Sequence, residues 1–582
     1  MRRGEFRATA SRKRRAQRAP TTAPRAAPSS EKSGWLVLAL AVPALGWLGS
    51  RASYFSAWMD DDAFISFRYA RNLVGGMGLV FNPGERVEGY SNFLWTVLLA
   101  AFHRVGFGIP ETARVLGCLF SLLTIVLLLV WGPRLLPTPR GGGGAIPRWL
   151  GALAALLLCT SETWAVWAVG GLENEFGAFL VLCAFLAYFR SLEGPAPATA
   201  PLVASGTACA LAAMTHPSYA LFGALLGAHL LVATARGRGG PRALAAFAGP
   251  IVAVALPYGA WKLAYYGHLL PNTFRAKVAM TPAVIFRGGR YFRDALLAFP
   301  LPFLALVLLP PAMLFTRVRD ARVWLIAAAV VGYCAYGLSI GGEVFPAFRL
   351  LVVLLPLLFI LVQYAVGLVV RSFRGATSRG VAGVTLLAAA LVVVSERGYR
   401  APRVRVLDPA IEQDLFSLIR ASARTLKREF PPDTLYAYSG AGVIAYETGF
   451  RFIDTLGLTD AHIASMAIPD AGSGDAGHEK GDGRYVLGRN PDVVHPADRV
   501  RAHHAAGVPP PLPAGAPGLP LHAARGRDAD GRAAPFRAPR PAAAPGPSTG
   551  RGRTPALTED HGSASEKVQS GWDPSRGCTL TW

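Results

Sequence analysis

Three adjacent carboxylates, Asp60, Asp61 and Asp62, follow directly on an apolar stretch of the chain. Ionised groups at the edge of a bilayer are costly and are commonly functional. Crowded like charges raise the pKa of one member of such a group, which suits a general base, and a carboxylate can also bind a divalent cation. We therefore take Asp61 and Asp62 as candidate catalytic residues. The alternative is a solvated helix at the membrane surface, in which Arg68 and Arg71 pair with the acids.

Later loops repeat the same residue types at the ends of apolar stretches. Aromatic rings suit the faces of a sugar, cations suit a phosphate, and a carboxylate suits a hydroxyl group. The candidates for donor or acceptor binding are Arg68, Glu88, Tyr90, Glu173, His216, Asn272, Arg275, Lys277, Glu343 and Arg349. This pattern predicts a site for a sugar carried on a lipid phosphate. The alternative is that these side chains are ordinary polar residues of surface loops.

Long apolar stretches must position these loops. The chain has 582 residues, of which 52% are hydrophobic and 16% charged, whereas a soluble protein carries about a quarter charged residues. A membrane-crossing helix needs about 20 apolar residues. We predict a helical polytopic membrane domain over residues 34–396 with eleven spans, at 34–50, 114–131, 149–166, 175–190, 202–215, 219–234, 243–264, 298–315, 322–339, 349–370 and 380–395.

The charged loops set the predicted sides of the membrane. Short basic loops are typical of the cytoplasmic side, where we also expect the basic, disordered arm 1–33. The apolar segment 92–105 could cross, but a crossing would turn every later basic loop outward, so we predict a membrane-surface or re-entrant helix. A crossing paired with a second, missed crossing is the alternative. The net charge of +23 lies in these loops and in the two terminal segments, so the sequence does not indicate a nucleic-acid partner.

The composition changes after Val394. Residues 397–494 read as a small extracytoplasmic α/β domain, with a helix over 411–430 and strands at 434–438 and 442–446. From 495 to 582 the chain is rich in Ala, Pro, Arg and Gly, and we expect a disordered tail. The abrupt change after Val494 leads to the hypothesis that this tail is a frameshift product.

Several motifs resemble those of bacterial GT-C glycosyltransferases, and among them the group of mycobacterial terminal β-(1→2) arabinofuranosyltransferases. The motifs are DDAFISFRYARNL from Asp61, FNPGERVEGYSN from Phe81, GLE from Gly171, YYGHLLPNTF from Tyr265, GGEVFPAFR from Gly341, IDTLGLTDAHIA from Ile453 and GHEKGDG from Gly477. The resemblance covers residues 34–494. Two positions depart from the family pattern, since His216 stands where Arg is expected and Glu343 where Asp is common.

The resemblance implies an inverting enzyme of the cell membrane with its active site on the outer face. Its donor would be a polyprenyl-phosphate sugar, with arabinofuranose as one candidate, and its acceptor a cell-envelope glycan. The acid of the first outer loop would be the base, which corresponds here to Asp61 or Asp62. Whether a divalent cation bound by one of them takes part stays open. The alternatives are a transporter or flippase of lipid-linked sugars, or an inactive subunit for envelope assembly.

Overall fold

The computed structural model describes residues 30–137, 146–194, 196–277, 279, 281–315, 320–372, 380, 383, 390, 409–468 and 471–495. All of them belong to one compact unit that spans residues 1–524. Nearly all of the predicted arm, most of the predicted span 380–395 and all but the first residue of the predicted tail lie outside the described residues.

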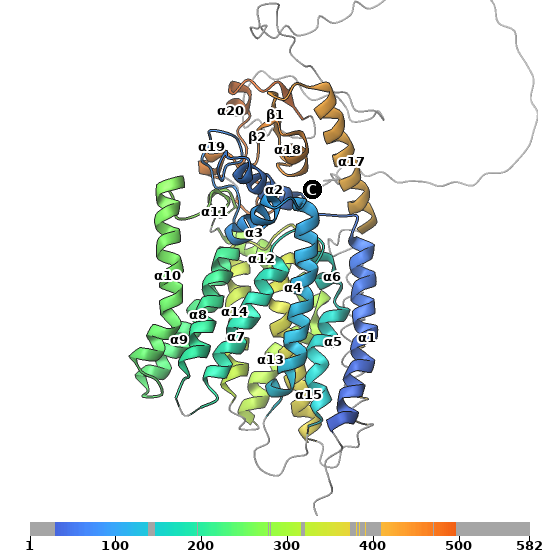
Figure 1. The fold of residues 1–582 in the computed structure, drawn as a ribbon, viewed down its shortest axis with the longest axis vertical. Coiled ribbons are helices and arrows are strands. Elements are labelled where there is room, and N and C mark those ends of the chain that lie inside the picture. The colour runs from blue at the N-terminus through green and yellow to red at the C-terminus, as the bar shows by residue number, and fades with distance from the viewer. Residues whose placement is uncertain are drawn as a thin grey trace, which may run out of the picture. The chain divides into compact units, whose positions relative to one another are not determined.

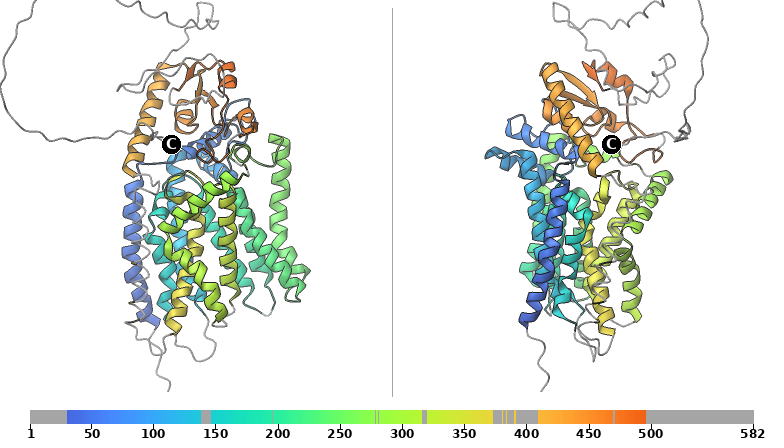
Figure 2. Two further views of the ribbon diagram at one scale, coloured as in Figure 1. Left: turned by 180° about the vertical axis from the view of Figure 1, so that it is seen from behind. Right: turned by 90° about the vertical axis from the view of Figure 1, so that its right-hand side faces the viewer.

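Long apolar helices form a bundle in which they run side by side (Figures 1 and 2). Among the described residues, five helices are long and apolar enough to cross a membrane, or six if the bent pair formed by α12 and α13 is one span. The chain is therefore a multi-pass membrane protein, while the predicted number of eleven spans stays a prediction. The bundle helices are α1 (Ser30–Phe55), α4 (Ile109–Trp131), α5 (Leu153–Thr160), α6 (Glu162–Trp167), α7 (Asn174–Ser191), α8 (Thr199–Thr215), α9 (Ala220–Ala235), α10 (Pro241–Tyr266), α13 (Pro300–Phe315), α14 (Ala321–Ser339) and α15 (Leu355–Ser372).

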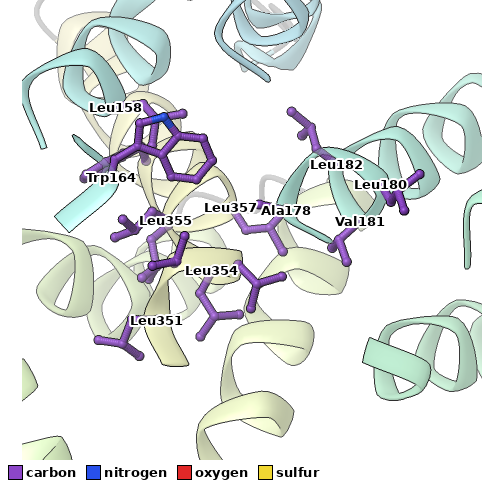
Figure 3. Packing of buried hydrophobic residues seen from close by; sticks show 14 of the residues in the cluster. Leu158, Trp164, Ala178, Leu180, Val181, Leu182, Leu351, Leu354, Leu355 and Leu357 are labelled. Atoms are coloured by element: carbon purple, nitrogen blue, oxygen red, sulfur yellow. The ribbon is translucent and has the colours of Figure 1, made fainter. Parts of the chain in front are cut away.

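The helices differ in how much of their surface other helices cover. The candidate span that contains α15 is 83% buried inside the protein, whereas the span of α10 is 11% buried. Leucines of α15 pack with Trp164 and with the apolar side chains of α7, as Figure 3 shows. Membrane helices associate mainly through van der Waals packing, because lipid tails are as apolar as leucine. The α15 side of the bundle is thus its most enclosed part, and α10 lies at its periphery.

Four short helices lie at one end of the bundle (Figure 1): α2 (Asp61–Val74), α3 (Phe93–Arg104), α11 (Asn272–Lys277) and α12 (Pro282–Ala298). Helix α3 has 12 residues. At 1.5 Å per residue it is about 18 Å long, which is short of the roughly 30 Å hydrocarbon core. This length agrees with the prediction that segment 92–105 does not cross. Helix α12, which the sequence did not predict, bends by 98° into α13.

The C-terminal region folds around a parallel sheet with strand order β2-β1-β3, formed by β1 (Leu435–Tyr438), β2 (Arg451–Asp454) and β3 (Val493–Val494). Its helices are α17 (Pro409–Glu429), α18 (Val443–Thr448), α19 (Ala461–Ser465) and α20 (Gly483–Gly488). The predicted helix 411–430 and the predicted strand 434–438 are confirmed. The predicted strand 442–446 is wrong, because these residues begin helix α18.

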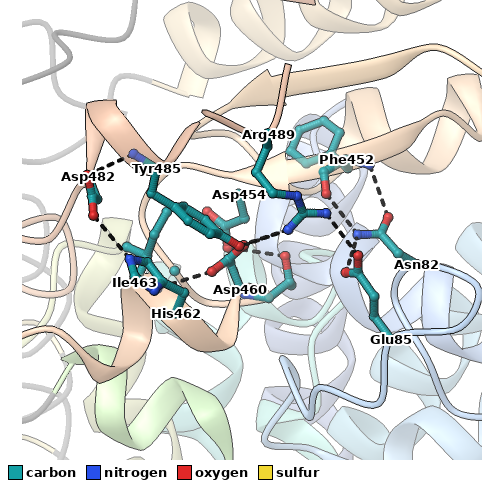
Figure 4. Close-up of polar contacts among 12 residues, drawn as sticks. Asn82, Glu85, Phe452, Asp454, Asp460, His462, Ile463, Asp482, Tyr485 and Arg489 are labelled. Carbon is teal, nitrogen blue, oxygen red and sulfur yellow. Dashed lines mark hydrogen bonds and ion pairs between the residues drawn. The ribbon is translucent and has the colours of Figure 1, made fainter. Parts of the chain in front are cut away.

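Polar contacts join this region to the loop that follows α2. Asn82 pairs with the backbone of Phe452, donating to its carbonyl at 2.8 Å and accepting from its N–H at 3.0 Å. Arg489 lies 3.0 Å from Glu85 of the same loop and donates to the Tyr485 hydroxyl at 2.8 Å. Figure 4 shows these contacts together with the carboxylates of the C-terminal region. The C-terminal region and the first loop therefore hold each other in place.

Candidate active site

The start of helix α2 is fixed by its own first carboxylate and by the loop before α7. The Asp60 side chain accepts a hydrogen bond from the Asp62 N–H at 3.0 Å, and the Asp60 N–H donates to the Gly170 carbonyl at 3.1 Å. Gly171 has φ +89°, and a Cβ there would lie 2.9 Å from Met59 Cγ. Only glycine suits this conformation and this close approach. The Gly171-Leu172-Glu173 motif is thus pressed against the base of α2.

Asp61 and Asp62 have different surroundings although they are neighbours. The Asp61 carboxylate accepts from the Gly442 N–H at 3.0 Å and from the Val443 N–H at 2.8 Å. Burial raises the pKa of Asp61 to about 6, and these hydrogen bonds oppose the rise. A side chain on Gly442 would collide with the Asp61 backbone, so glycine permits the contact. Asp61 thereby caps α18 and joins α2 to the C-terminal region.

Asp62 instead faces a cation. Its side chain is 27% exposed, and Oδ2 lies 3.7 Å from Nζ of Lys277 at the end of α11. The same Nζ lies 5.5 Å from the centre of the Phe345 ring. A carboxylate that is partly exposed and next to a cation can exchange a proton with a bound molecule. The structure thus brings together two candidates that are far apart in sequence, Asp62 and Lys277.

Arg349 supplies a second cation, held by Glu343 and by a strained backbone. Its Nη2 lies 3.0 Å from Glu343 Oε2, and its guanidinium carbon lies 3.6 Å from the centre of the Phe345 ring. The preceding residues Ala347 and Phe348 have φ values of +49° and +50°. Positive φ in residues with a Cβ costs free energy and persists where the surroundings enforce it, frequently at functional sites. Directly after this turn, Arg349 lies beside Glu343 and Phe345.

Buried polar groups surround the two cations. Glu173 accepts from Asn92 Nδ2 at 2.6 Å, and burial raises the pKa of its carboxyl while Arg349 lowers it. Burial raises the pKa of Asp60 well above its ordinary value, the Asp62 charge adds to the rise, and Arg349 opposes it. Burial also lowers the pKa of His216 to about 3, with further contributions from Arg349 and Lys277. Hence His216 is neutral near pH 7. We call Asp60, Asp62, Glu173, Lys277, Glu343 and Arg349 the charged cluster.

The alternative in which Arg68 and Arg71 pair with the acids is contradicted by the contacts of both arginines. Arg68 is buried and donates to the carbonyls of Phe81, Ala445 and Phe450, at 2.7, 2.5 and 2.6 Å. Arg71 donates to the Tyr446 carbonyl at 2.6 Å. Both arginines therefore join α2 to the C-terminal region and direct their guanidinium groups away from the charged cluster.

Four further candidates are engaged in contacts that hold the loops. Glu88 is buried and lies 2.9 Å from Lys262 Nζ, and Tyr90 lies 3.1 Å from the Tyr266 hydroxyl. Asn272 donates to the backbone carbonyls of Gly457 and Leu458 at 2.8 and 3.0 Å. Arg275 is exposed and lies 2.9 Å from His268 Nδ1. The structure gives these residues positions that support the first loop, α11 and the C-terminal region.

Sequence reasoning missed two partners. Lys262 lies within the apolar helix α10, and a buried cation in such a helix usually pairs with a buried acid. Its partner is Glu88. Arg287 of α12 contacts Glu479 from a helix that the sequence did not predict. Among the described residues, no group of three or more His, Cys, Asp and Glu could hold a metal ion. Lys277 lies beside Asp62 and Arg349 beside Glu343, so each of the two cations of the charged cluster has a carboxylate neighbour.

Comparisons with known proteins show which proteins this chain is similar to. A family described as a domain of unknown function (DUF8728) matches residues 409–522, a range that begins with α17 and passes the predicted boundary at 494. The terminal beta-(1->2)-arabinofuranosyltransferase of Mycobacterium tuberculosis is 32% identical over 250 residues, covering 42% of this chain. Its namesake in Corynebacterium glutamicum is 27% identical over 389 residues, covering 60% of this chain. The alignments span 38% and 54% of these relatives' own lengths. They confirm the resemblance that the motifs indicated.

Two solved structures of ArnT from Cupriavidus metallidurans also align with this chain. One is bound to undecaprenyl phosphate and one is in the apo state, with TM-scores of 0.47 and 0.46 and identities of 16% and 17%. Each covers 72% of this chain, and the alignments cover 86% and 85% of the ArnT chains.

Proposed function

We propose that this chain is an inverting glycosyltransferase with a GT-C-like helical scaffold. It moves a sugar from a polyprenyl-phosphate donor to a cell-envelope glycan on the outer face of the cell membrane. The observation that carries the proposal is the partly exposed Asp62 carboxylate 3.7 Å from Lys277, beside an Asp61 whose carboxylate is already bonded. The names of the two curated relatives favour arabinofuranose as the sugar.

The reaction needs a base, and Asp62 is the group placed to act as one. Asp62 takes the proton of an acceptor hydroxyl, and the oxygen attacks the anomeric carbon on the face opposite the phosphate. The new glycosidic C–O bond forms as the bond from the anomeric carbon to the phosphate oxygen breaks. Polyprenyl phosphate leaves with the electron pair, so the anomeric configuration inverts. A positioned base contributes about 10²–10⁴-fold to such a rate.

The cations stabilise the departing phosphate. Lys277 lies at the end of α11 beside Asp62, and Arg349 follows the strained turn at 347–348. In a site with little water their attraction for the developing negative charge is stronger than in bulk solvent. His216 is neutral near pH 7 and can bond a sugar hydroxyl without adding charge to the site.

Transfer by purified protein tests the proposal. The protein is incubated in detergent or liposomes with a labelled polyprenyl-phosphate arabinofuranose and an arabinan acceptor. We expect label in the glycan, joined through a bond of inverted configuration that mass spectrometry and NMR identify. A flippase would instead move the labelled lipid across a liposome bilayer without forming a glycosidic bond. Lipid movement with no labelled glycan would overturn the proposal.

A further inference from the structure

The segment 471–480 packs against the start of α12. Gly472 has φ +99°, and a Cβ there would lie 2.4 Å from Val284 N and 2.5 Å from the Ala283 carbonyl carbon, which is closer than van der Waals contact allows. The Thr281 hydroxyl donates to the Ala471 carbonyl at 2.8 Å. The two backbones therefore lie in direct contact, and glycine at 472 allows this close approach. The GHEKGDG motif that begins at Gly477 overlaps this segment.

Arg287 of α12 holds segment 471–480 through an ion pair and hydrogen bonds. Its buried guanidinium lies 2.9 Å from Glu479 Oε2 and donates to the carbonyls of Gly474 at 2.9 Å and Gly341 at 3.2 Å. The other oxygen of Glu479 accepts from the N–H groups of Gly472 and Gly474 at 2.6 and 3.1 Å. Both oxygens of Glu479 and the Nε and Nη1 groups of Arg287 have partners, whereas the buried Nη2 of Arg287 has no hydrogen-bond partner among the described residues. A buried, charge-assisted pair of this kind is specific in geometry. Arg287 thus joins segment 471–480 to the loop that carries Glu343.

The same segment confines Lys277. Gly477 has φ +81°, and a Cβ there would lie 3.1 to 3.2 Å from Cγ, Cδ and Cε of Lys277. Lys480 Nζ donates at 2.8 Å to the carbonyl of Arg275, two residues before Lys277. A lysine stem has several rotatable bonds, so its ammonium group is well placed only when the stem is packed. Segment 471–480 supplies that packing opposite Asp62.

We propose that segment 471–480 is a wall of the transfer site, and that Arg287 and Glu479 are positioning residues that hold the Lys277 ammonium group opposite Asp62. The inference rests on the proposed function and adds to it the region of the chain that sets the phosphate-binding cation. It also gives the GHEKGDG motif a role, because Gly477 contacts Lys277 while Glu479 bonds to Arg287.

The test compares Glu479→Gln with a matched control. Glu447→Gln removes a 2.8 Å ion pair to Arg420 in the same C-terminal region, and that pair lies outside segment 471–480. We expect Glu479→Gln to raise the KM for the polyprenyl-phosphate sugar about tenfold with kcat changed less than twofold. Its unfolding midpoint should fall, because the change leaves the buried Arg287 charge without its carboxylate. Glu447→Gln should leave both kinetic constants unchanged. Equal kinetic behaviour of the two variants would overturn the inference.

Double substitution shows whether Glu479 acts through Lys277. If it does, adding Glu479→Gln to Lys277→Gln should raise KM no further, whereas independent effects would multiply. Gly477→Ala keeps the ion pair and presses a methyl group on the lysine stem, so it should also raise KM even if Glu479→Gln folds poorly. Multiplied effects, or a Gly477→Ala variant with the wild-type KM, would contradict the inference.

Binding of polyprenyl phosphate alone separates this inference from the proposed function. The wild type should bind this lipid, and Glu479→Gln should bind it about tenfold more weakly. A wild type that binds the lipid phosphate but transfers no sugar would overturn the proposed function. The ratio of the lipid affinities of the wild type and Glu479→Gln would still test the role proposed for segment 471–480. Equal binding by the wild type and Glu479→Gln would overturn the wall itself.

Discussion

Two acidic networks of this molecule are similar in residue type and differ in what their carboxylates bind. In the C-terminal region, Asp454 accepts from the N–H groups of Leu456 and Thr459 at 3.0 and 2.8 Å, and Asp460 accepts from the Ile463 N–H at 3.0 Å. Asp454 thus caps a turn and Asp460 caps the start of α19, and Figure 4 labels both acids. Asp460 also lies 3.8 Å from Arg489 but, unlike Asp62, accepts a backbone N–H at the start of a helix. In the charged cluster, Asp62 faces Lys277.

This difference separates acids that hold the fold from acids that can react. A carboxylate whose oxygens accept backbone N–H groups has a fixed geometry and little capacity to take a proton from a ligand. A carboxylate that faces a cation at the protein surface keeps an oxygen for a bound molecule. The neighbouring residues Asp61 and Asp62 show the same contrast, since the Asp61 carboxylate caps α18 whereas the Asp62 carboxylate faces Lys277.

Among the variants that keep Asp62, Arg349→Gln should produce the largest loss. It removes the cation that Glu343 and the turn at 347–348 hold beside the charged cluster. We expect kcat/KM to fall about 10²–10³-fold, because a preorganised group that stabilises developing charge contributes on that scale. Initial rates of sugar transfer measure the effect. A loss below tenfold would remove Arg349 from the reaction.

Asp61→Asn should act on the docking of the C-terminal region. An amide keeps one acceptor oxygen and places an NH₂ group against one of the two N–H donors at 442 and 443. A buried hydrogen bond to a charged group is worth about 1.5–3 kcal/mol, so we expect a lower unfolding midpoint and faster proteolysis of residues 409–495. Transfer should fall less than in Arg349→Gln. Unchanged protease protection would show that Asp61 does not hold this region.

The pH dependence of unfolding should respond to Asp454→Asn. Burial raises the pKa of Asp454 from 3.8 to about 7, against the effect of its hydrogen bonds. A group whose pKa is higher in the folded protein stabilises it at low pH, and this stabilisation is lost as the pH rises toward the folded value. The wild-type unfolding midpoint should therefore fall more steeply between pH 4 and 7 than that of Asp454→Asn. Parallel curves would contradict this assignment.

Arg489→Gln should have the smallest effect. Arg489 lies 3.0 Å from Glu85, and both side chains are about a third exposed. Ion pairs that are partly exposed to water contribute about 0–1 kcal/mol. We expect the unfolding midpoint to fall by no more than a few degrees and sugar transfer to stay near the wild-type rate. A large loss of sugar transfer would contradict this prediction and would show that the C-terminal acidic network contributes to the reaction.

Periodicity and hydropathy were enough to predict the main helices. Helix α17 and strand β1 lie where the sequence placed them, and most predicted spans within the described residues lie in helix. The predicted span 149–166 is divided at Ser161 between α5 and α6. The strand predicted at 442–446 failed because a short apolar run fits either state. The deciding contact is the Asp61 carboxylate, which bonds to the first N–H groups of α18 from a distant part of the chain.

The charged cluster could be predicted by residue type but not by partner. Asp62, Glu173, Lys277, Glu343 and Arg349 were all selected from their loops, and hydrogen bonds or ion pairs now give each of them a neighbour. Arg68 was also selected, yet its guanidinium group donates to backbone carbonyls of the loop after α2 and of the C-terminal region. Local sequence shows the charge of a side chain, whereas its partner depends on tertiary contacts between remote segments.

The most direct test of the central claim compares Asp62→Asn with Asp61→Asn in one transfer assay. Each purified variant is given labelled polyprenyl-phosphate sugar and acceptor, and protease protection of residues 409–495 is recorded in parallel. The account predicts that Asp62→Asn lowers transfer by about 10²–10⁴-fold with full protection, and that Asp61→Asn weakens protection and keeps more of the activity. Full transfer by Asp62→Asn would contradict the account.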